Sequence, residues 1–599
     1  MSAYATLRGN SSNSTNIEED DVEEIIKYQS NSSDNESDDD KDQQFESLRQ
    51  QAEEIHSNSQ TPGNLNDTRP VISLSNFYPT CSNIRYFRSS IEFKLTSNQY
   101  ILIRGQFKFK VISGSIKLNN FHIISESDAY HDMNNLGQSV PMIQNHSITG
   151  SSTILISDLI NGIEKIVKLP NPTKTYSFQL SSGVNALYID DKWIELLENL
   201  TYKSQQIINT SPNMRKRRTF MVIGNKNTGK STFAKTLLNS IIENYNMPVV
   251  YLDLDPGQSE YNQPLNLSMT KVENVNYGSH SFNYTESQTT KYYGFNNPVS
   301  LINRYESIVE NFDKLFNDQY PMIINTPGYI KGYGKELLTK ITNKFQPDNL
   351  ILLSNKLDIN ANENKEVVEN LQYENLNIIP GVYQSVKNSI QMRDLSKLLY
   401  FHQKTPCEFD FRHYLIDKSP LKLSYSTNEN KGYIKSFTIL NHSSTDLDMK
   451  ELPFMIEAQI WAIYKTKNSI NVVSNSKSPN YLNPEEFEFT NGYLGLIIIH
   501  SVNMKEKYVN MYTPNHVVEK IQDAVIDGYS LVCCRGGNSD SEVPNYEMLY
   551  PNFLKLKQNA IKNGNGNNFD LPYINFEKNL KIGGIWKPRR NLMRRSHQR

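Results

Sequence analysis

Residues 219–245 place a glycine-rich loop between an apolar stretch and an amphipathic one. The loop fits the pattern G-x-x-x-x-G-K-[S/T] without mismatch, TFMVI (219–223) before it predicts a buried strand, and residues 233–245 predict a helix. A strand, a glycine-rich turn and a helix N-terminus aim backbone N–H groups at one anion. We therefore expect a nucleotide-phosphate site formed by Gly224, Asn225, Lys226, Asn227, Thr228, Gly229, Lys230, Ser231 and Thr232.

Within this loop two side chains carry specific expectations. The Lys230 ammonium is expected to reach the outer phosphates, and the Ser231 hydroxyl is expected to bind Mg²⁺. The alternative is a chance loop of glycine and lysine with no ligand.

Two carboxylates follow the next apolar run, VVYLDLDPGQ (249–258). The i, i+2 spacing of Asp253 and Asp255 predicts that both lie on one side of a strand end beside the phosphate loop. Acids there hold Mg²⁺ or its waters, and one of them can accept a proton from an attacking hydroxyl. Gln258 is expected to position the nucleophile or a phosphate oxygen. The structural alternative is a helix cap and a turn acid.

The two ends of the chain differ sharply in charge. Residues 1–60 carry 15 Asp and Glu against 4 Lys and Arg, whereas residues 581–599 carry seven Lys and Arg and no acid. The acidic end is poor in aromatic residues and is predicted to be disordered. A basic end favours a polyanion or an acidic protein surface as partner, and a merely solvated tail is the alternative. No signal peptide or run of about 18 apolar residues is present, so no membrane partner is expected.

Strand and helix patterns change along the chain. Alternating apolar and polar residues in 100–124 predict antiparallel strands. In residues 219–402 strand patterns and helix patterns follow one another, which predicts strands alternating with helices. A second β-rich pattern begins near residue 405. The predicted parts are 1–70 (disordered acidic tail), 71–210 (β-rich), 211–402 (phosphate-loop domain with a parallel sheet), 403–580 (β-rich) and 581–599 (basic arm).

The phosphate loop together with D-x-D-x-G-Q resembles the polynucleotide 5′-hydroxyl kinases of RNA processing. KYYGFNNP (291–298) resembles an aromatic-Gly-x-x-Ser-Pro segment of that family, with Asn297 in place of Ser. INTPGYIKGYG (324–334) resembles the family's clasp, with Tyr329 where Trp is usual. IQMRDLSKLLYFH (390–402) falls where the family has an arginine-containing lid, with Lys397 at the position of a second lid arginine. The resemblance covers residues from about 70 to 599.

The resemblance implies an α/β fold: a central P-loop kinase domain flanked by two β-rich domains. It implies ATP and Mg²⁺ as cofactors and RNA with a 5′-hydroxyl end as substrate. Asp255 would activate that hydroxyl, and Asp253 would be a metal ligand or a supporting acid. Arg393 would stabilise charge on the transferring phosphoryl group. Three clasp residues would clamp the terminal nucleotide: Thr326, Gly328 and Tyr329. The Tyr329 ring would stack on a base.

The acidic N-terminus and the basic C-terminus resemble the fungal nucleolar member of the family. That likeness implies nuclear and nucleolar localisation, pre-ribosomal RNA as substrate and a larger hetero-complex with an endonuclease subunit. Trp and Arg are common interface anchors. The basic arm is therefore expected to dock on the endonuclease through Trp586, Arg589 and Arg590. An address signal or an RNA-binding patch is the alternative for this arm.

Two other functions fit parts of the sequence. SNKLD (354–358) matches the guanine-specificity pattern N-K-x-D, and NTPG (325–328) resembles the GTPase D-T-P-G with Asn325 for Asp, so a P-loop GTPase is one alternative. A nucleotide-binding scaffold without turnover is the other.

Overall fold

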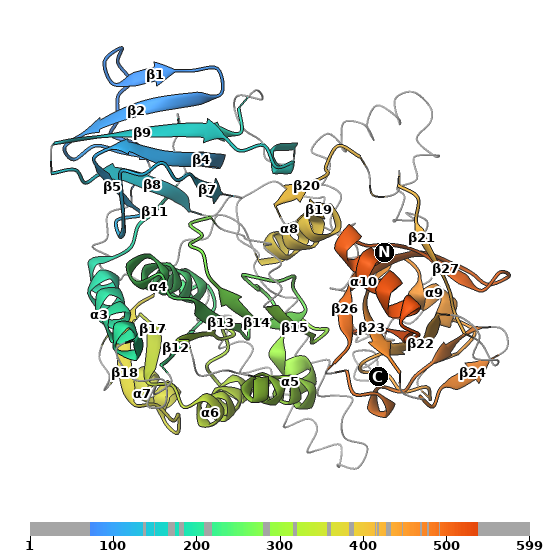
Figure 1. Ribbon diagram of the computed structural model, residues 1–599. Helices are drawn as coiled ribbons and strands as arrows, with labels where there is room; N and C mark the ends of the chain where they lie inside the picture. The colour runs from blue at the N-terminus through green and yellow to red at the C-terminus, as the bar shows by residue number, and fades with distance from the viewer. Residues whose placement is uncertain are drawn as a thin grey trace, which may run out of the picture. The chain divides into compact units, whose positions relative to one another are not determined.

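The computed structural model describes residues 72–536 apart from internal gaps, the longest of which are 166–173, 179–184, 209–217, 279–287, 382–388 and 427–432. The described chain divides into two compact units between Tyr414 and Leu415. The first unit holds a β-rich N-terminal part and the phosphate-loop part (Figure 1). The predicted acidic tail (1–70) and basic arm (581–599) lie outside the described residues.

The N-terminal part consists of two sheets packed through their apolar faces, and all of their strand pairs are antiparallel except β11 and β8, which are parallel. One has the order β1-β2-β9-β4-β10 with β7 beside β4, and the other has the order β11-β8-β5-β6 with β3 beside β8. β9 buries alternate residues toward a core that includes Phe93, Phe107 and Ile154. The strands are β1 (Ile84–Tyr86), β2 (Ser90–Thr96), β3 (Tyr100–Leu102), β4 (Arg104–Ser113), β5 (Ser115–Leu118), β6 (His122–Ser125), β7 (His131–Asn134), β8 (Val140–Asn145), β9 (Ser151–Asp158), β10 (Tyr176–Ser177) and β11 (Ala186–Leu187).

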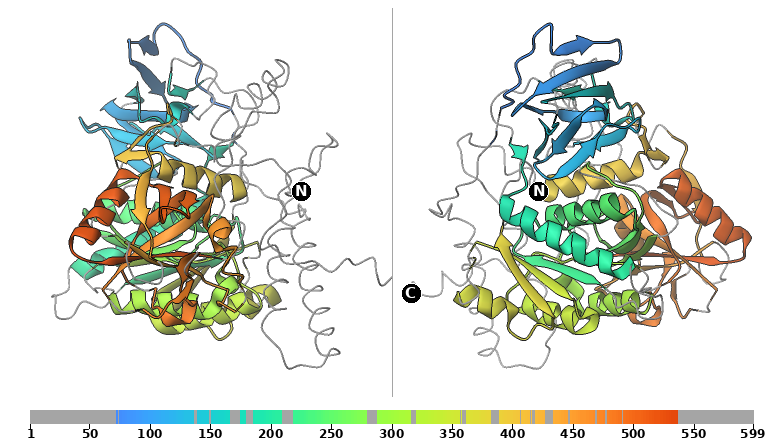
Figure 2. Two further views of the ribbon diagram at one scale, coloured as in Figure 1. Left: turned by 90° about the vertical axis from the view of Figure 1, so that its right-hand side faces the viewer. Right: turned by 60° about the vertical axis from the view of Figure 1, so that its left-hand side comes forward.

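The phosphate-loop part is a sheet of seven strands with the order β15-β14-β13-β16-β12-β17-β18. Its central strands are buried along almost their whole length because helices cover both faces: α3 and α4 lie on one face, and α5, α6 and α7 lie on the other (Figures 1 and 2). The strands are β12 (Thr219–Gly224), β13 (Val249–Asp253), β14 (Asn266–Val272), β15 (Gln288–Tyr292), β16 (Met322–Asn325), β17 (Asn349–Ser354) and β18 (Asn375–Pro380). The helices are α3 (Asp191–Ile208), α4 (Lys230–Tyr245), α5 (Ile302–Leu315), α6 (Tyr333–Phe345), α7 (Asn362–Val368) and α8 (Ser389–Phe401).

The sheet is mixed, so the prediction of a parallel sheet was wrong in part. β13, β16, β12, β17 and β18 are parallel, whereas β14 runs antiparallel to β13 and β15 antiparallel to β14. The segment between β13 and β14, residues 254–265, contains no helix. Without a crossover helix the chain returns directly beside the strand it has left, and such a pair is antiparallel. We call this segment the acid loop.

Helix α3 precedes the phosphate-loop strand and packs onto α4. The Trp193 ring contacts Phe233 with ring centroids 5.3 Å apart, and its indole N–H donates to the Pro380 carbonyl at 2.8 Å. The helix therefore contributes to the core of the phosphate-loop part, although its sequence adjoins the N-terminal strands.

The second unit is built on one sheet of eight strands with the order β21-β27-β26-β23-β28-β22-β25-β24. Among the described residues, no helix combines the length and apolar character needed to cross a membrane. The strands are β21 (Leu421–Ser424), β22 (Ile434–Ile439), β23 (Gln459–Thr466), β24 (Val473–Asn475), β25 (Ser478–Tyr481), β26 (Tyr493–Asn503), β27 (Tyr508–Tyr512) and β28 (Ser530–Arg535), with helices α9 (Leu452–Ile456) and α10 (Asn515–Ile526).

Candidate active site

The phosphate loop joins central strand β12 to helix α4. Gly224 is required because a Cβ there would lie 2.8 Å from the Leu353 carbonyl oxygen, and its φ is 153°. Asn227 and Gly229 have φ values of 61° and 91°, which turn the backbone N–H groups inward at the helix start. Loop and helix thus have the geometry expected of an anion cradle.

Lys230 lies across this loop. Its ammonium donates a hydrogen bond of 2.9 Å to the Asn225 carbonyl, and its side chain is buried. Burial lowers the pKa of Lys230 to about 8, although the nearby Asp255 carboxylate opposes the shift. The Lys230 ammonium therefore lies beside the backbone that would surround a phosphate. A bound phosphoryl oxygen could replace the Asn225 carbonyl as its hydrogen-bond acceptor.

Asp253 ends strand β13 and is fully buried. Its Oδ2 accepts a hydrogen bond from the Glu260 backbone N–H at 2.7 Å. Its Oδ1 accepts from the Asn325 amide at 3.1 Å and the Asp255 N–H at 3.3 Å. Burial is the main cause that raises the pKa of Asp253 to about 8. This carboxyl group is fixed in orientation and is enclosed by protein.

Asp255 lies beyond the strand, in the turn of the acid loop. Its Oδ1 accepts from the Gly257 N–H at 3.0 Å, and the residue is half-buried. β13 ends at Asp253, so the period-two rule from which we predicted that both acids lie on one side of a strand end does not extend to Asp255, which the turn positions instead. The turn gives the two acids different surroundings, one enclosed and one accessible.

Asn325 connects Ser231 of the phosphate loop to Asp253. It ends β16, which pairs with both β12 and β13, and is the register partner of Val222 on one side and Asp253 on the other. Its Nδ2 lies 3.3 Å from Ser231 Oγ and 3.1 Å from Asp253 Oδ1. In the sequence, Asn325 belongs to the segment 324–334 that resembles the clasp and is also a mismatch to a GTPase acid, and neither pattern predicted this connecting role. Its position at the end of an apolar strand was the available signal.

The clasp residues lie against the phosphate loop. Gly328 is packed so closely that a Cβ would lie 2.8 Å from the Lys226 backbone nitrogen. The Thr326 hydroxyl is buried and donates to the Val222 carbonyl at 2.8 Å, so this hydroxyl holds the clasp to β12, and a contact with RNA would require that bond to break. Tyr329 is half-buried, beside the backbone of Gly334.

Asn297, which stands in place of serine in the segment 291–298, caps a short helix. The Asn297 side chain accepts a hydrogen bond from the Val299 N–H at 3.0 Å and caps the short helix Pro298–Leu301. Asn and Ser are interchangeable as N-caps, so the departure from the family pattern preserves the turn.

Gln258 is half-buried, and its side chain makes no hydrogen bond among the described residues. Arg393 and Lys397 are both buried on α8. The apolar side of α8 packs through Leu395 and Leu399 against Ile163 of the N-terminal part and Phe409. These contacts place the predicted lid helix against the N-terminal part.

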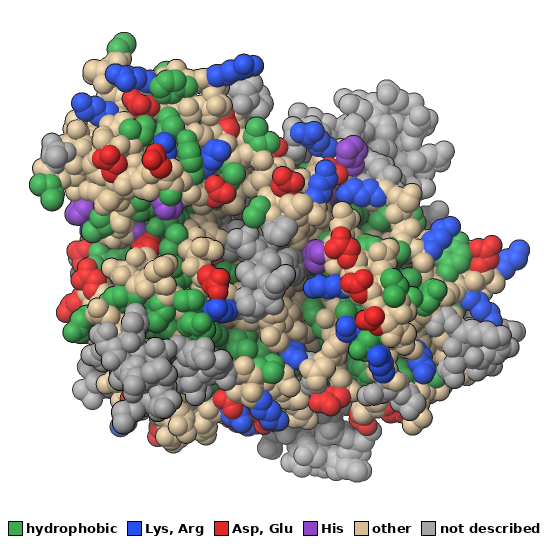
Figure 3. Space-filling model, in the orientation of Figure 1, with side chains coloured by type: hydrophobic (Ala, Val, Ile, Leu, Met, Phe, Trp, Pro, Cys, Tyr) green, Lys and Arg blue, Asp and Glu red, His purple; other side chains and the backbone are tan. Residues whose placement is uncertain are grey.

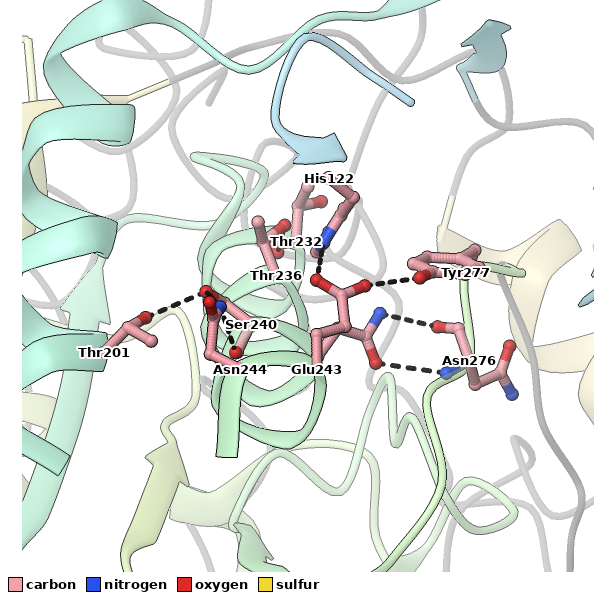
Figure 4. A network of polar contacts seen from close by, with 10 residues as sticks. His122, Thr201, Thr232, Thr236, Ser240, Glu243, Asn244, Asn276 and Tyr277 are labelled. Carbon is pink, nitrogen blue, oxygen red and sulfur yellow. Dashed lines mark hydrogen bonds and ion pairs between the residues drawn. The ribbon is translucent and has the colours of Figure 1, made fainter. Parts of the chain in front are cut away.

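A polar network holds the side of helix α4 (Figure 4). The Glu243 carboxylate contacts His122 Nδ1 of strand β6 at 2.8 Å and also accepts a hydrogen bond from the Tyr277 hydroxyl. Asn239 exchanges two hydrogen bonds with the Asn276 backbone, at 2.9 and 3.1 Å. The helix that begins at the phosphate loop is thereby fixed to the N-terminal part.

The fold and the site define a P-loop phosphotransferase. The phosphate loop follows the central strand β12, and Lys230 and Ser231 stand at the start of the next helix. Asp253 ends β13, which is separated from β12 by β16. This arrangement makes a site for a nucleoside triphosphate. Residues 224–403 match the family described as mRNA cleavage and polyadenylation factor CLP1 P-loop.

Two relatives share most of this chain. The polynucleotide 5′-hydroxyl-kinase GRC3 of Candida albicans is 34% identical, covering 100% of this chain and 99% of its own. The GRC3 of Debaryomyces hansenii is 32% identical, covering 90% and 91%. A solved structure of the wild-type Clp1p–Pcf11p complex aligns with a TM-score of 0.47 at 14% identity, covering 75% of this chain and 99% of that one. The chain belongs to the polynucleotide 5′-hydroxyl-kinase GRC3 family, and it is a P-loop polynucleotide kinase.

Proposed function

We propose that this protein transfers the γ-phosphoryl group of ATP to the 5′-hydroxyl of RNA. The observation that carries the proposal is the different environment of the two acids. Asp253 is enclosed and held by three N–H groups, whereas Asp255 is half-buried near the Lys230 ammonium. A general base must be reachable by the hydroxyl it deprotonates, and Asp255 meets this condition.

The residues around the loop also fit a magnesium ion. Magnesium in P-loop sites takes a Ser or Thr hydroxyl, an acid and phosphate oxygens, and it keeps several waters. Ser231 and Asp253 are brought to one place through Asn325. When bound, the ion would neutralise charge on the phosphates.

The chain's own residues account for the remaining steps. Lys230 would leave the Asn225 carbonyl and bind a phosphoryl oxygen, and the backbone of the loop would orient the other phosphates. Asp255 would take the proton of the 5′-hydroxyl as the hydroxyl oxygen bonds to the γ-phosphorus, and the bond from that phosphorus to the β,γ-bridging oxygen would break to release ADP. Arg393, if α8 closes over the loop, would stabilise charge on the transferring group, a contribution of 10³ or more in related transfers.

The test is transfer of label from γ-labelled ATP to an RNA with a 5′-hydroxyl. The wild type should label this RNA, an RNA bearing a 5′-phosphate should stay unlabelled, and Lys230→Ala should abolish labelling while the protein melts normally. Hydrolysis of GTP without labelling would identify a GTPase instead, and nucleotide binding without either reaction would identify a scaffold.

We further propose that the RNA is a pre-ribosomal RNA and that the protein works in the nucleolus with an endonuclease. The acidic residues before 60 and the seven cations after 580 support this, because the nucleolar member of the family has such termini. Trp586, Arg589 and Arg590 lie outside the described residues. Deletion of residues 582–599 should spare labelling of a free oligonucleotide and weaken endonuclease binding. Mislocalisation with an unchanged complex would instead identify an address signal.

A further inference from the structure

The segment that follows strand β9 of the N-terminal part lies against Phe409, which comes shortly after helix α8. The Phe409 N–H donates a hydrogen bond of 2.7 Å to the Asn161 carbonyl. Gly162 lies so close to Phe409 that an added Cβ would be 1.9 Å from the Phe409 carbonyl oxygen. The φ of Gly162 is 95°, which residues with a side chain rarely adopt. Glycine is therefore required for the two backbones to lie this close together.

Asn161 is itself fixed to a sheet of the N-terminal part. Its Nδ2 donates to the side-chain oxygen of Asn134 at 3.0 Å, and its Oδ1 accepts from the Ile163 N–H at 3.2 Å. Asn134 is the last residue of strand β7, which pairs with β4. The turn that contacts Phe409 is therefore attached to a strand of the sheet.

Phe409 belongs to a hairpin at the C-terminal end of α8. The hairpin pairs β19 (Gln403–Thr405) with β20 (Glu408–Phe409). His402 joins α8 to this hairpin. Its Nδ1–H donates to the Asp410 carbonyl at 2.6 Å, and the Asp410 N–H donates to the His402 carbonyl at 2.8 Å. Because these bonds tie the start of the hairpin to its end, a displacement of Phe409 also displaces the end of α8.

One face of α8 completes the attachment. Arg393 and Lys397 each precede a leucine of this face by two residues, and at about 100° per residue the two cations lie on the opposite face. Charged side chains of both signs are spread over the surface drawn in Figure 3, whereas the apolar side chains here are each at most 9% exposed, so substitutions among them act through packing. These side chains form one cluster: Ile163, Leu395, Leu399 and Phe409. We call Asn161, Gly162, Ile163 and Phe409 the lid anchor.

The chain that leads into α8 starts beside the phosphate loop. Gly381 follows strand β18, and a Cβ there would lie 3.2 Å from the Cβ of Thr228. The Thr228 hydroxyl donates to the Asn225 carbonyl within the loop at 2.9 Å. Helix α8 begins at Ser389 and ends at the hairpin that contacts the lid anchor. The segment that carries Arg393 therefore starts at the nucleotide site and ends on the N-terminal part.

We infer that the lid anchor sets the position of Arg393 during phosphoryl transfer, with Gly162 as the positioning residue that allows the close backbone contact. The inference rests on the proposed function for the reaction that Arg393 assists. A group that stabilises the transferring phosphoryl must be precisely placed, and a misplacement of about 1 Å can lower a rate about a hundredfold. The N-terminal part thereby positions a residue of the phosphate-loop part for catalysis.

The experiment is a double-mutant cycle on the full chain, read out by single-turnover and steady-state labelling of RNA from γ-labelled ATP. Gly162→Ala requires the Phe409 carbonyl to move by about 1 Å to reach a contact of 3.0 Å. It should lower kcat about tenfold to a hundredfold with little change in the KM for ATP, because the phosphate loop itself is unaltered. In the Arg393→Ala background the positioned group is already lost, so Gly162→Ala should cause little further loss.

The matched control is Gly150→Ala. Gly150 lies in the same N-terminal part with a φ of 84°, and a Cβ there would meet nothing within 4 Å. Its alanine has a similar backbone strain without the collision, so kcat should stay at the wild-type value. If Gly162→Ala does not fold, Phe409→Leu takes its place in the cycle. Leucine keeps an apolar side chain and loosens the packing on α8, and its effect on kcat should again depend on Arg393.

Equal fold-losses of kcat in the wild-type and Arg393→Ala backgrounds overturn the inference, since the lid anchor would then act only on general folding. A wild-type kcat in folded Gly162→Ala overturns it as well. If the wild type labels no RNA, the proposed function fails, and hydrogen exchange of the α8 amides decides the anchoring instead. Faster exchange in Gly162→Ala than in Gly150→Ala supports the lid anchor, and equal exchange contradicts it.

Discussion

The backbone N–H of Glu260 donates a hydrogen bond of 2.7 Å to the buried carboxyl of Asp253. The side chain of Glu260 points to Lys235 of helix α4, with Nζ and Oε2 3.7 Å apart and both side chains at least four-fifths buried. Lys235 also donates to the Gly278 carbonyl. A buried ion pair between the phosphate-loop helix and the acid loop therefore fixes the residue that orients Asp253.

Replacing Lys235 with Met should reduce kcat about tenfold or more with little change in KM for ATP, because the acid loop would no longer be anchored. Leaving Glu260 buried without its partner should also cost about 3–5 kcal/mol of unfolding free energy. Steady-state kinetics and denaturant unfolding measure the two effects.

The matched control is Lys340→Met, which breaks an exposed pair with Glu306 in the same part of the chain. Surface pairs contribute about 0–1 kcal/mol, so both kcat and stability should stay near wild type. Lys235→Arg should restore most of kcat. Equal behaviour of the Lys235→Met and Lys340→Met variants would contradict an anchoring role for Lys235.

Asn325→Leu should raise the Mg²⁺ concentration needed for half-maximal activity. The substitution keeps the side-chain size and removes the N–H donor shared by Ser231 and Asp253. We expect kcat to fall about tenfold to a hundredfold, since residues that orient metal ligands have effects of this size and Ser231 and Asp253 are the proposed ligands. A magnesium titration measures the change. An unaltered magnesium requirement in a stably folded variant would refute the connecting role of Asn325.

The affinity of the nucleotide-free protein for ATP should fall as the pH rises above about 8. Burial lowers the pKa of Lys230 to about 8, so the ammonium is charged below that pH and neutral above it. The neutral amine cannot attract a phosphate. Calorimetric titration with ATP in EDTA across this range measures the effect without a titrating metal. Lys230→Met should bind ATP weakly at every pH, and a wild-type affinity that is constant or rises with pH would contradict the assignment.

The contiguous parts of the site were predictable from the sequence. The loop from Gly224 to Thr232 and the apolar strand before it are local, since a single turn and a helix start specify the geometry. The placement of the acids was harder. Asp253 was expected at a strand end, whereas Asp255 is positioned by a turn that the period-two pattern does not describe.

The contacts between distant segments could not be predicted. Asn325 meets Ser231 and Asp253 only because β16 lies between β12 and β13, and strand order is not encoded in local periodicity. The antiparallel pairing of β14 was missed for the same reason. Lys235 and Glu260 each read as ordinary surface charges, and only the packing of α4 on the acid loop buries them together.

The most direct test of the central claim compares single-turnover transfer by the wild type and Asp255→Asn, with ATP affinity measured on the same samples. Asp255→Asn keeps the size of the side chain and removes the proton acceptor, so it should bind Mg²⁺-ATP about as tightly as the wild type. Transfer to the 5′-hydroxyl of RNA should be about 10²- to 10⁴-fold slower, the usual contribution of a general base. Wild-type transfer rates in Asp255→Asn, or loss of Mg²⁺-ATP binding as the only defect, would contradict the assignment of Asp255 as the base.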